Sequence, residues 1–342
     1  LGLARSLRKQ GERVRVLAPC DGPPPDAGVT PLGSSLPTAA NGSVAPVAPD
    51  PAAQLRVIRA MRDEVFDVVH LHEPLAPGPT TTTLLTRPAP MIGTFHAAGS
   101  SLAYEMMPNV VRFLANRLDD RCAVSEDARK MAIAGVGGSY DLTFNGVEIA
   151  RFGSGVPHPT QGPTILFLGR HEPRKGLADL LVALQELPAD TRLWVAGEGP
   201  ETDALKARFA GDARVEWLGT IGETEKISRL RGADVFCAPS LHGESFGIVL
   251  LEAMAAGTPV VACDIPGYAN VARHGSDAVL VSPGDTKMLA EAIRKVLTEP
   301  RRRDALIESG RKRADNFSMA RLASLYLERY ERLMARSAVR PG

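Results

Sequence analysis

The chain has 342 residues, of which 44% are hydrophobic, and its 40 Lys and Arg residues nearly balance 39 Asp and Glu residues. This length fits about two domains, each large enough to bury its own core. The net charge of +1 lacks the basic excess of a nucleic-acid-binding protein, and no apolar run approaches the roughly 20 residues needed to cross a bilayer. The four cysteines are scattered and form no CxxC pair, so neither a disulfide framework nor a zinc site is expected. We therefore expect a cytoplasmic protein that can still touch the inner face of a membrane.

The chain opens on a short amphipathic helix rather than on the strand with which an α/β domain ordinarily begins. Leu3 and Leu7 lie on one side of this helix, which ends near Gly11, and a strand follows at residues 14–18. The first strand of such a domain and the loop after it are thus expected to be missing. Residues 20–51 are rich in Pro, Gly and Ala and are expected to form a long irregular connection.

Beyond residue 51 the pattern alternates between helices and short apolar strands, which is typical of parallel sheets covered by helices on both faces. The expected helices are residues 51–63, 80–86, 109–119, 126–134, 177–187, 201–209, 223–231, 248–256, 287–297 and 319–335. The expected strands are residues 66–72, 91–95, 121–124, 164–169, 191–196, 215–218, 234–238, 259–262 and 278–281.

Turn-forming residues without periodicity occupy residues 156–163, and we place the linker between two domains there. The expected domains are residues 1–156 and 163–316, and the helix of residues 317–342 is expected to pack back toward the first domain. Both domains are predicted to be doubly wound and Rossmann-like, with a cleft between them.

Two carboxylates, Glu244 and Glu252, stand eight residues apart across a glycine-containing turn that opens a helix. If the helix begins near Gly247, Glu244 lies in the preceding loop and Glu252 lies about one turn inside. Both can then face one ligand at the helix N-terminus, where free N–H groups and the helix dipole favour an anion.

Two cations follow the strand of residues 164–169 at its carboxyl end. Arg170 comes directly after Gly169, and Lys175 precedes a helix five residues later. Such a pair suits a diphosphate whose negative charge grows as it departs. The two carboxylates can bind sugar hydroxyls, and the two cations and the helix N-terminus can bind a diphosphate. Together they indicate a nucleotide-sugar site.

At this point the motifs resemble a known family. Gly-Arg-x4-Lys-Gly at residues 169–176, and Glu-x7-Glu at residues 244–252 followed by Ala-Met-Ala-Ala-Gly-Thr-Pro-Val-Val, are similar to motifs of the retaining glycosyltransferases of family 4, which have the GT-B fold. The likeness covers nearly the whole chain. Asn-Gly-Ser-Val-Ala at residues 41–45 and Glu-Pro-Arg-Lys-Gly at residues 172–176 favour the phosphatidylinositol α-mannosyltransferases within that family.

The resemblance implies a role for each matching residue on the donor side. Arg170 and Lys175 would hold the donor diphosphate, Glu244 would bind hydroxyls of the transferred sugar, and Glu252 would bind the ribose. The remaining donor-binding positions are Gly169, Ile221, Lys226 and the backbone of Phe246, Gly247, Ile248 and Val249, of which Ile221 and Lys226 belong to the region that packs on guanine.

On the acceptor side, the resemblance implies that His96 sits beside the anomeric centre and that Asn41 and Ser43 meet an inositol phosphate head group. It also implies a same-face substitution in which the departing phosphate helps to remove the acceptor proton. His70 and His72 alternate on one strand without a third ligand at useful spacing, so a structural role is expected for them rather than a metal site.

The expected activity is transfer of mannose from GDP-mannose to phosphatidylinositol or a related acceptor. No tightly bound cofactor is expected, a divalent cation is compatible but not implied, and nucleic acid is not a partner. Pro46 and Ala40 stand where the relatives have an arginine and a tyrosine, and Arg56, Arg59 and Arg62 give only a weak basic stripe for peripheral membrane contact. Three alternatives remain. The enzyme could have the same fold and chemistry with another nucleotide-sugar donor or a soluble acceptor, or the protein could bind a nucleotide-sugar without transferring it. A UDP-sugar 2-epimerase is a more distant alternative.

Overall fold

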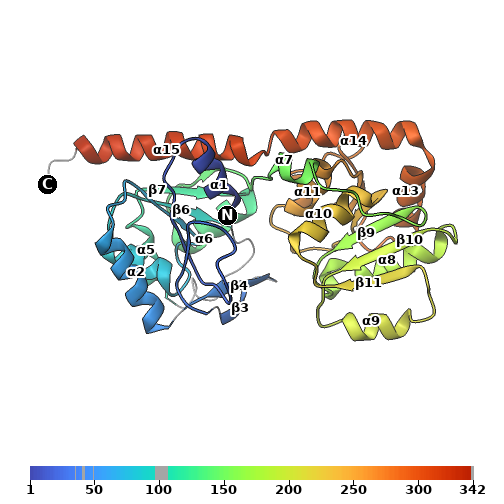
Figure 1. Cartoon of the computed structure of the whole chain (residues 1–342), viewed down its shortest axis with the longest axis horizontal. Coiled ribbons are helices and arrows are strands. Elements are labelled where there is room, and N and C mark those ends of the chain that lie inside the picture. The colour runs from blue at the N-terminus through green and yellow to red at the C-terminus, as the bar shows by residue number, and fades with distance from the viewer. Residues whose placement is uncertain (35, 41–42, 49, 97–106, 340–342) are drawn as a thin grey trace. The chain divides into compact units, whose positions relative to one another are not determined.

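The computed structural model describes residues 1–34, 36–40, 43–48, 50–96 and 107–339, with the backbone alone at residues 36–40, 43–47, 338 and 339. The chain forms two compact units (Figure 1). The first combines Leu1–Gly146 with Met319–Gly342, and the second is Val147–Ser318. The stretch of residues 156–163, where the sequence placed a linker, therefore lies inside the second unit.

The first unit contains a four-stranded parallel sheet in the order β5-β6-β7-β8. Its strands are β5 (Val69–His72), β6 (Met91–Phe95), β7 (Asp120–Ala123) and β8 (Asp141–Leu142). All five residues of β6 are buried, as expected for a central strand covered on both faces. The predicted strands at residues 66–72, 91–95 and 121–124 correspond to β5, β6 and β7.

The helices of the first unit begin at recognisable signals. They are α1 (Gly2–Lys9), α2 (Pro51–Asp63), α3 (Pro79–Thr86), α5 (Pro108–Ala115), α6 (Glu126–Val136) and α15 (Met319–Val339). The Asp50 side chain accepts the Ala53 N–H at 2.8 Å at the start of α2. Ser125 caps α6 in the same way, as its sequence position predicted.

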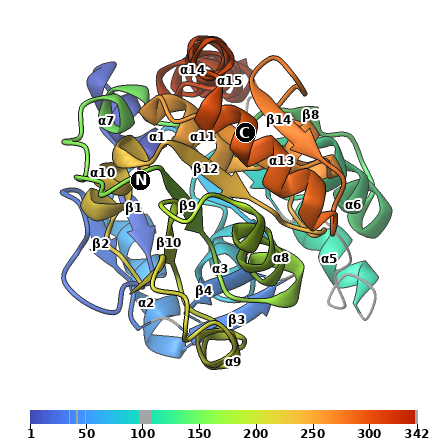
Figure 2. The same cartoon turned by 90° about the vertical axis from the view of Figure 1, so that its right-hand side faces the viewer.

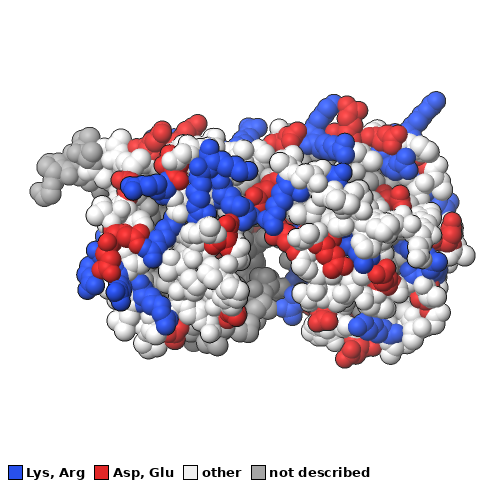
Figure 3. All heavy atoms as spheres, in the orientation of Figure 1, with Lys and Arg blue, Asp and Glu red and all other residues white. Residues whose placement is uncertain are grey.

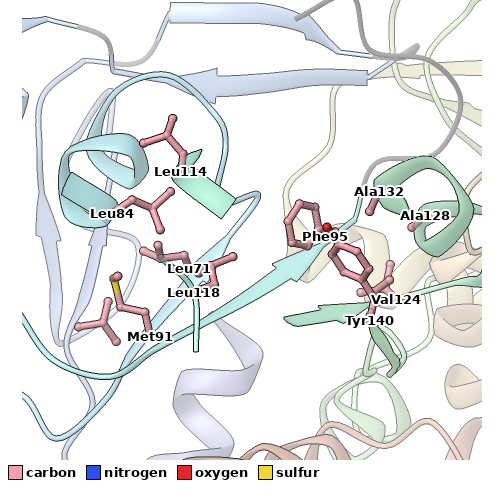
Figure 4. Packing of buried hydrophobic residues seen from close by; sticks show 12 residues of the cluster. Leu71, Leu84, Met91, Phe95, Leu114, Leu118, Val124, Ala128, Ala132 and Tyr140 are labelled. Carbon is pink, nitrogen blue, oxygen red and sulfur yellow. The ribbon is translucent and has the colours of Figure 1, made fainter. Parts of the chain in front are cut away.

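One apolar cluster lies between the sheet and helices α3, α5 and α6 (Figure 4). Leu71, Met91 and Leu118 pack with Leu84 of α3 at one end of the cluster. At the other end the rings of Phe95 and Tyr140 meet edge to face with centroids 5.0 Å apart. The cluster fixes the sheet, and with it the carboxyl ends of β5 and β6.

The segment expected to be an irregular connection contains three short strands. β1 (Val16–Ala18) pairs in parallel with β2 (Val29–Pro31), and β3 (Leu36–Ala40) forms an antiparallel hairpin with β4 (Ser43–Val47). The Pro and Ala residues of β2, β3 and β4 hide these strands in the sequence, because both residue types have little strand propensity.

Helix α15 returns to the first unit and covers one face of its sheet. Leu322, Tyr326 and Leu333 pack against Ile92 and Cys122, and burying each such side chain contributes roughly 1.5–3 kcal/mol. Arg329 of the same helix places one guanidinium nitrogen 2.7 Å from a carboxylate oxygen of Asp120 and another 2.7 Å from one of Asp141. These aspartates are the first residues of β7 and β8, so Arg329 joins α15 to both strands.

The second unit is built on a six-stranded parallel sheet in the order β11-β10-β9-β12-β13-β14. Its strands are β9 (Thr164–Leu168), β10 (Arg192–Ala196), β11 (Val215–Gly219), β12 (Val235–Ala238), β13 (Val260–Cys263) and β14 (Ala278–Val281). Counted from β9, this is the order 3-2-1-4-5-6 of a doubly wound dinucleotide-binding fold. In such sheets ligands bind outside the carboxyl ends of the strands where the order reverses, here between β9 and β12.

Helices lie on both faces of this sheet, with α8 and α13 together on one face and α10 and α11 on the other (Figure 2). The α-helices are α7 (Ile149–Gly153), α8 (Leu177–Ala183), α9 (Thr202–Arg208), α10 (Glu223–Gly232), α11 (Ile248–Ala256), α12 (Pro266–Ala269), α13 (Thr286–Thr298) and α14 (Pro300–Asp315). The second unit also contains two short 3-10 helices, η1 (Pro173–Lys175) and η2 (Leu184–Glu186). Two Rossmann-like α/β units with parallel sheets confirm the predicted fold class, and the reversal of strand order is seen in the second unit.

The chain passes between the units at residues 146/147 and again at residues 318/319. These two passages lie side by side, because Val147 and Ser318 form a parallel bridge and the Val147 N–H donates to the Phe317 carbonyl at 2.9 Å. On each unit, acidic and basic side chains are intermixed over the face seen in Figure 3, in keeping with the near-zero net charge.

Candidate active site

The predicted donor residues of the second unit come together where the strand order reverses. The segment after β9 carries Gly169, Arg170 and Lys175, and the segment after β12 leads through Glu244 to the start of α11. Because β9 and β12 are neighbours and parallel, both segments leave the same edge of the sheet.

Glu244 is the centre of this cluster. Its Oε1 is ion-paired with Lys175, accepts a hydrogen bond from the Ser240 hydroxyl at 3.1 Å, and lies 3.5 Å from Nη1 of Arg174. The three charged side chains of Glu244, Lys175 and Arg174 are only 14–19% exposed. The Tyr268 hydroxyl lies 2.9 Å from Ser240 and can donate to it, so a relay from Tyr268 through Ser240 orients the carboxylate.

The turn η1 is joined tightly to the segment after β12. The Leu241 N–H donates to the Arg174 carbonyl at 2.7 Å. Gly176, which ends η1 with φ of +67°, lies so close to the Pro239 carbonyl that a Cβ there would overlap it. A glycine is therefore required at this position, both for its backbone angle and for this close approach.

Arg170 takes a different partner from Lys175. Its Nε lies 2.9 Å from Oε1 of Glu172, whose other oxygen accepts from Nε of Arg174 at 2.9 Å. The Arg170 side chain is 42% exposed. Glu172 thus links two cations, and Arg170 remains accessible to an anion at the end of β9.

The N-terminus of α11 is open to a ligand. Gly247 precedes the helix with φ of +87°, and among the described residues no side chain caps the first N–H groups. Ile248 and Val249 supply those groups and the positive end of the helix dipole. The side chain of Phe246 is buried against Phe317, with ring centroids 5.8 Å apart, so only its backbone faces this site.

Glu252, on α11, pairs with Lys226 of α10 at 2.8 Å. The Lys226 ammonium also lies 5.2 Å from the centre of the Phe152 ring. Burial raises the pKa of Glu252, and Lys226 opposes this shift. Ile221 lies in the short turn that joins the carboxyl end of β11 to α10, the helix that carries Lys226.

His96, predicted to act at the anomeric centre, lies in the first unit directly after β6. Its backbone N–H donates to Oε1 of Glu73 at 2.7 Å, and its Nε2 lies 2.9 Å from Nδ1 of His72. Burial lowers the pKa of His96 to about 4, against the effect of a hydrogen bond with the Asn145 side chain. The imidazole is therefore neutral at pH 7.

His70 has the structural role that its sequence position suggested. Its Nδ1 lies 2.7 Å from the Tyr330 hydroxyl and its Nε2 lies 2.7 Å from the Thr94 hydroxyl, so both ring nitrogens are used within the fold. Within the part of the chain that the structure describes, no three His, Cys, Asp or Glu residues are grouped to hold a metal ion.

The two predicted acceptor residues are not placed. Asn41 lies outside the described residues, and Ser43 is the first residue of β4 with its backbone alone described. Conversely, sequence reasoning missed Glu172, Arg174 and Ser240 as partners of the predicted site. Glu172 and Arg174 lie inside the motif at residues 172–176, whereas nothing local signals Ser240.

Comparison with known sequences identifies the family. Residues 1–151 match the profile described as Glycosyltransferase Family 4, and residues 152–313 match the one described as Glycosyl transferases group 1. The phosphatidyl-myo-inositol mannosyltransferase of Mycobacterium leprae is 38% identical, over 97% of this chain and 91% of that protein. The chain belongs to glycosyltransferase family 4. The enzyme of the same name from Mycolicibacterium smegmatis is 36% identical over 97% of this chain and 88% of its own.

Solved structures show the same fold. A sucrose-phosphate synthase from Thermosynechococcus elongatus is 19% identical, with a TM-score of 0.71 over 98% of this chain and 92% of that chain. Anabaena HepE, solved in complex with UDP and glucose, is 20% identical, with a TM-score of 0.66 over 83% of this chain and 84% of that one. These likenesses confirm the GT-B fold, and the family match confirms that the chain is a glycosyltransferase.

Proposed function

We propose that this glycosyltransferase transfers mannose from GDP-mannose, with retention, to phosphatidylinositol or a related acceptor. The donor half of the proposal is supported by the cluster of Glu244, Lys175 and Arg174 at the switch point beside the open N-terminus of α11. The identity of the sugar and the acceptor is supported by the names of the relatives, two of which are 38% and 36% identical over 97% of this chain.

In this proposal Lys175 and Arg170 bind the donor diphosphate, together with the Ile248 and Val249 N–H groups and the backbone of Gly169, Phe246 and Gly247. A diphosphate suits these groups because it is an anion with several acceptor oxygens. Glu244 binds hydroxyls of the mannose, because its carboxylate is already held in place by Ser240.

Glu252 binds the ribose hydroxyls, with Lys226 beside it. The turn containing Ile221 packs on the guanine. An ionised carboxylate accepts two hydroxyl donors, which is the arrangement that a ribose diol requires.

The reaction is a substitution on one face of the sugar. The bond between the anomeric carbon and the phosphate oxygen breaks, the acceptor oxygen forms the new bond, and the acceptor proton passes to the departing phosphate. Lys175 and Arg170 stabilise the charge that grows on the diphosphate. His96 contacts the sugar near the anomeric centre, and Asn41 and Ser43 meet the inositol phosphate.

The enzyme acts at the cytoplasmic face of the membrane through weak peripheral contact, and it needs no tightly bound cofactor in this proposal. Among the described helices, none is both long and apolar enough to span a bilayer. On α2, Arg59 and Arg62 share Asp63, while Arg56 donates to the Leu32 carbonyl at 2.7 Å. Because these three arginines have partners within the protein, α2 offers less positive charge to lipid head groups than its sequence suggests.

The test is a mass-spectrometric transfer assay with GDP-mannose or UDP-glucose as donor, and with phosphatidylinositol vesicles or soluble myo-inositol 1-phosphate as acceptor. We expect a hexosylated lipid from GDP-mannose, with an α linkage seen by NMR. Equal use of the uracil nucleotide would overturn the donor assignment. Product from the soluble acceptor alone would overturn the lipid assignment.

A further inference from the structure

The carboxyl end of β5 exposes a histidine that the proposed chemistry leaves unused. His70 and His72 lie on the same side of β5, with their rings stacked at a centroid distance of 4.3 Å. Both ring nitrogens of His70 are hydrogen-bonded, one to the hydroxyl of Tyr330 in α15 and the other to the hydroxyl of Thr94. His72 lies two residues farther along the strand and is exposed. This face of the sheet is therefore closed by α15 at His70 and open at His72.

The contact with His96 uses one of the two ring nitrogens of His72. Nε2 of His96 lies 2.9 Å from Nδ1 of His72, so one ring donates to the other across this contact. The other nitrogen of His72, Nε2, belongs to an exposed ring and makes no hydrogen bond within the described part of the chain. It is the atom of this pair that a ligand can reach.

The backbone holds this pair of histidines rigidly. Glu73 follows His72 with φ of +50°, an uncommon angle for a residue other than glycine. Its carboxylate accepts the His96 N–H at 2.7 Å, and its own N–H donates to the Thr94 carbonyl at 2.9 Å. Strained residues that tie two strand ends together often support a functional site.

We propose that His72 is an acceptor-binding residue, whose Nε2 accepts a hydrogen bond from a hydroxyl of the polyol acceptor while its Nδ1 contacts His96. This inference rests on the proposed function. A lone pair selects a group that can donate a proton, so His72 contacts a ring hydroxyl of the acceptor and not a deprotonated phosphate. The hydroxyl keeps its proton in this contact, and the attacking hydroxyl still delivers its proton to the departing phosphate.

Two substitutions at this position separate the hydrogen bond from the shape of the ring. His72→Phe keeps an aromatic ring that can stack on His70 but removes both nitrogens, whereas His72→Gln can place an amide oxygen near the position of Nε2. For His72→Phe we expect the acceptor KM to rise about tenfold, the equivalent of one lost hydrogen bond. Because His96 loses a hydrogen-bond partner in this variant, hydrolysis of GDP-mannose by water should also fall, but by a smaller factor than transfer to the acceptor. His72→Gln should recover part of the acceptor affinity.

His70→Asn is the matched control, because it alters a neighbouring histidine with a purely structural role. It should lower Tm and reduce transfer and hydrolysis by the same factor. An unchanged acceptor KM in His72→Phe, or a parallel loss of transfer and hydrolysis there, would overturn the proposal.

A second measurement does not depend on turnover. In 15N spectra of the histidine side chains, Nε2 of His72 should appear unprotonated and should shift when myo-inositol 1-phosphate is added. A protonated Nε2, or no shift, would contradict the assignment of His72. An enzyme that neither transfers nor hydrolyses GDP-mannose would instead contradict the proposed function, so the two failures are distinguishable.

Discussion

Replacing Lys175 with methionine removes one positive charge from the switch point while keeping most of the side-chain volume. Breaking the sugar–phosphate bond adds up to one negative charge to the departing diphosphate. At about 4 Å and an effective dielectric constant near 20, a full charge interacts with Lys175 by about 4 kcal/mol, and a half-developed one by about 2 kcal/mol. We therefore expect kcat to fall roughly 30- to 1000-fold.

The folded state should also lose stability, but less than an uncompensated buried pair would. Lys175 and Glu244 are 19% and 14% exposed, so their ion pair is largely shielded from water, and removing one partner of a buried pair costs about 3–5 kcal/mol when the other charge is left alone. Glu244 keeps its contacts with Ser240 and Arg174. The free energy of unfolding should therefore fall by only about 1–3 kcal/mol.

The assay compares kcat for transfer with Tm from thermal unfolding in the same preparations. Lys206→Met is the matched control, because Lys206 is an exposed lysine of α9 outside the site and its loss changes the net charge equally. If Lys175→Met and Lys206→Met differed by less than about threefold in kcat, the electrostatic reasoning would be refuted.

Three further outcomes follow from the geometry. Burial raises the pKa of Glu252, so this carboxylate becomes protonated at a pH above the ordinary glutamate value of 4.5 and the donor KM should rise there as the pH falls. The Glu252→Gln variant should bind the donor more weakly at all pH values, and its donor KM should depend less on pH. Gly176→Ala should displace η1 from the Pro239 carbonyl, and it should both lower Tm and raise the donor KM, because the added Cβ meets backbone atoms at a positive φ; an unchanged Tm and KM would contradict the close approach. Arg329→Met should lower the free energy of unfolding by about 1–3 kcal/mol, because it leaves two aspartates at the starts of β7 and β8 without their shared cation, and urea denaturation would measure this.

Local patterns predicted the elements of the second unit well, for a physical reason. Buried parallel strands are continuous apolar runs, so the predicted strand at residues 278–281 coincides with β14. The predicted helix at residues 248–256 coincides with α11, because glycines stand at both of its ends. The predicted strand at residues 14–18 contains β1, whereas the short strands β2, β3 and β4 in the first unit have neither signal.

The partners of the site residues could not be predicted in the same way. Ser240 reaches Glu244 within one local segment, but Lys175 and Arg174 do so only because β9 and β12 are neighbours in the sheet. That adjacency depends on the order of all six strands. The contact between His72 and His96 likewise depends on the pairing of β5 with β6, in which His72 is opposite Thr94.

The return of α15 to the first unit has a consequence for the order in which the protein folds. The second unit is one continuous segment, Val147–Ser318, and it can complete its sheet as soon as that segment has left the ribosome. The first unit must wait for α15, since Leu322, Tyr326 and Leu333 cover its sheet. During synthesis the donor-binding unit should therefore be finished first, while the apolar face around Ile92 and Cys122 stays uncovered until the last helix arrives.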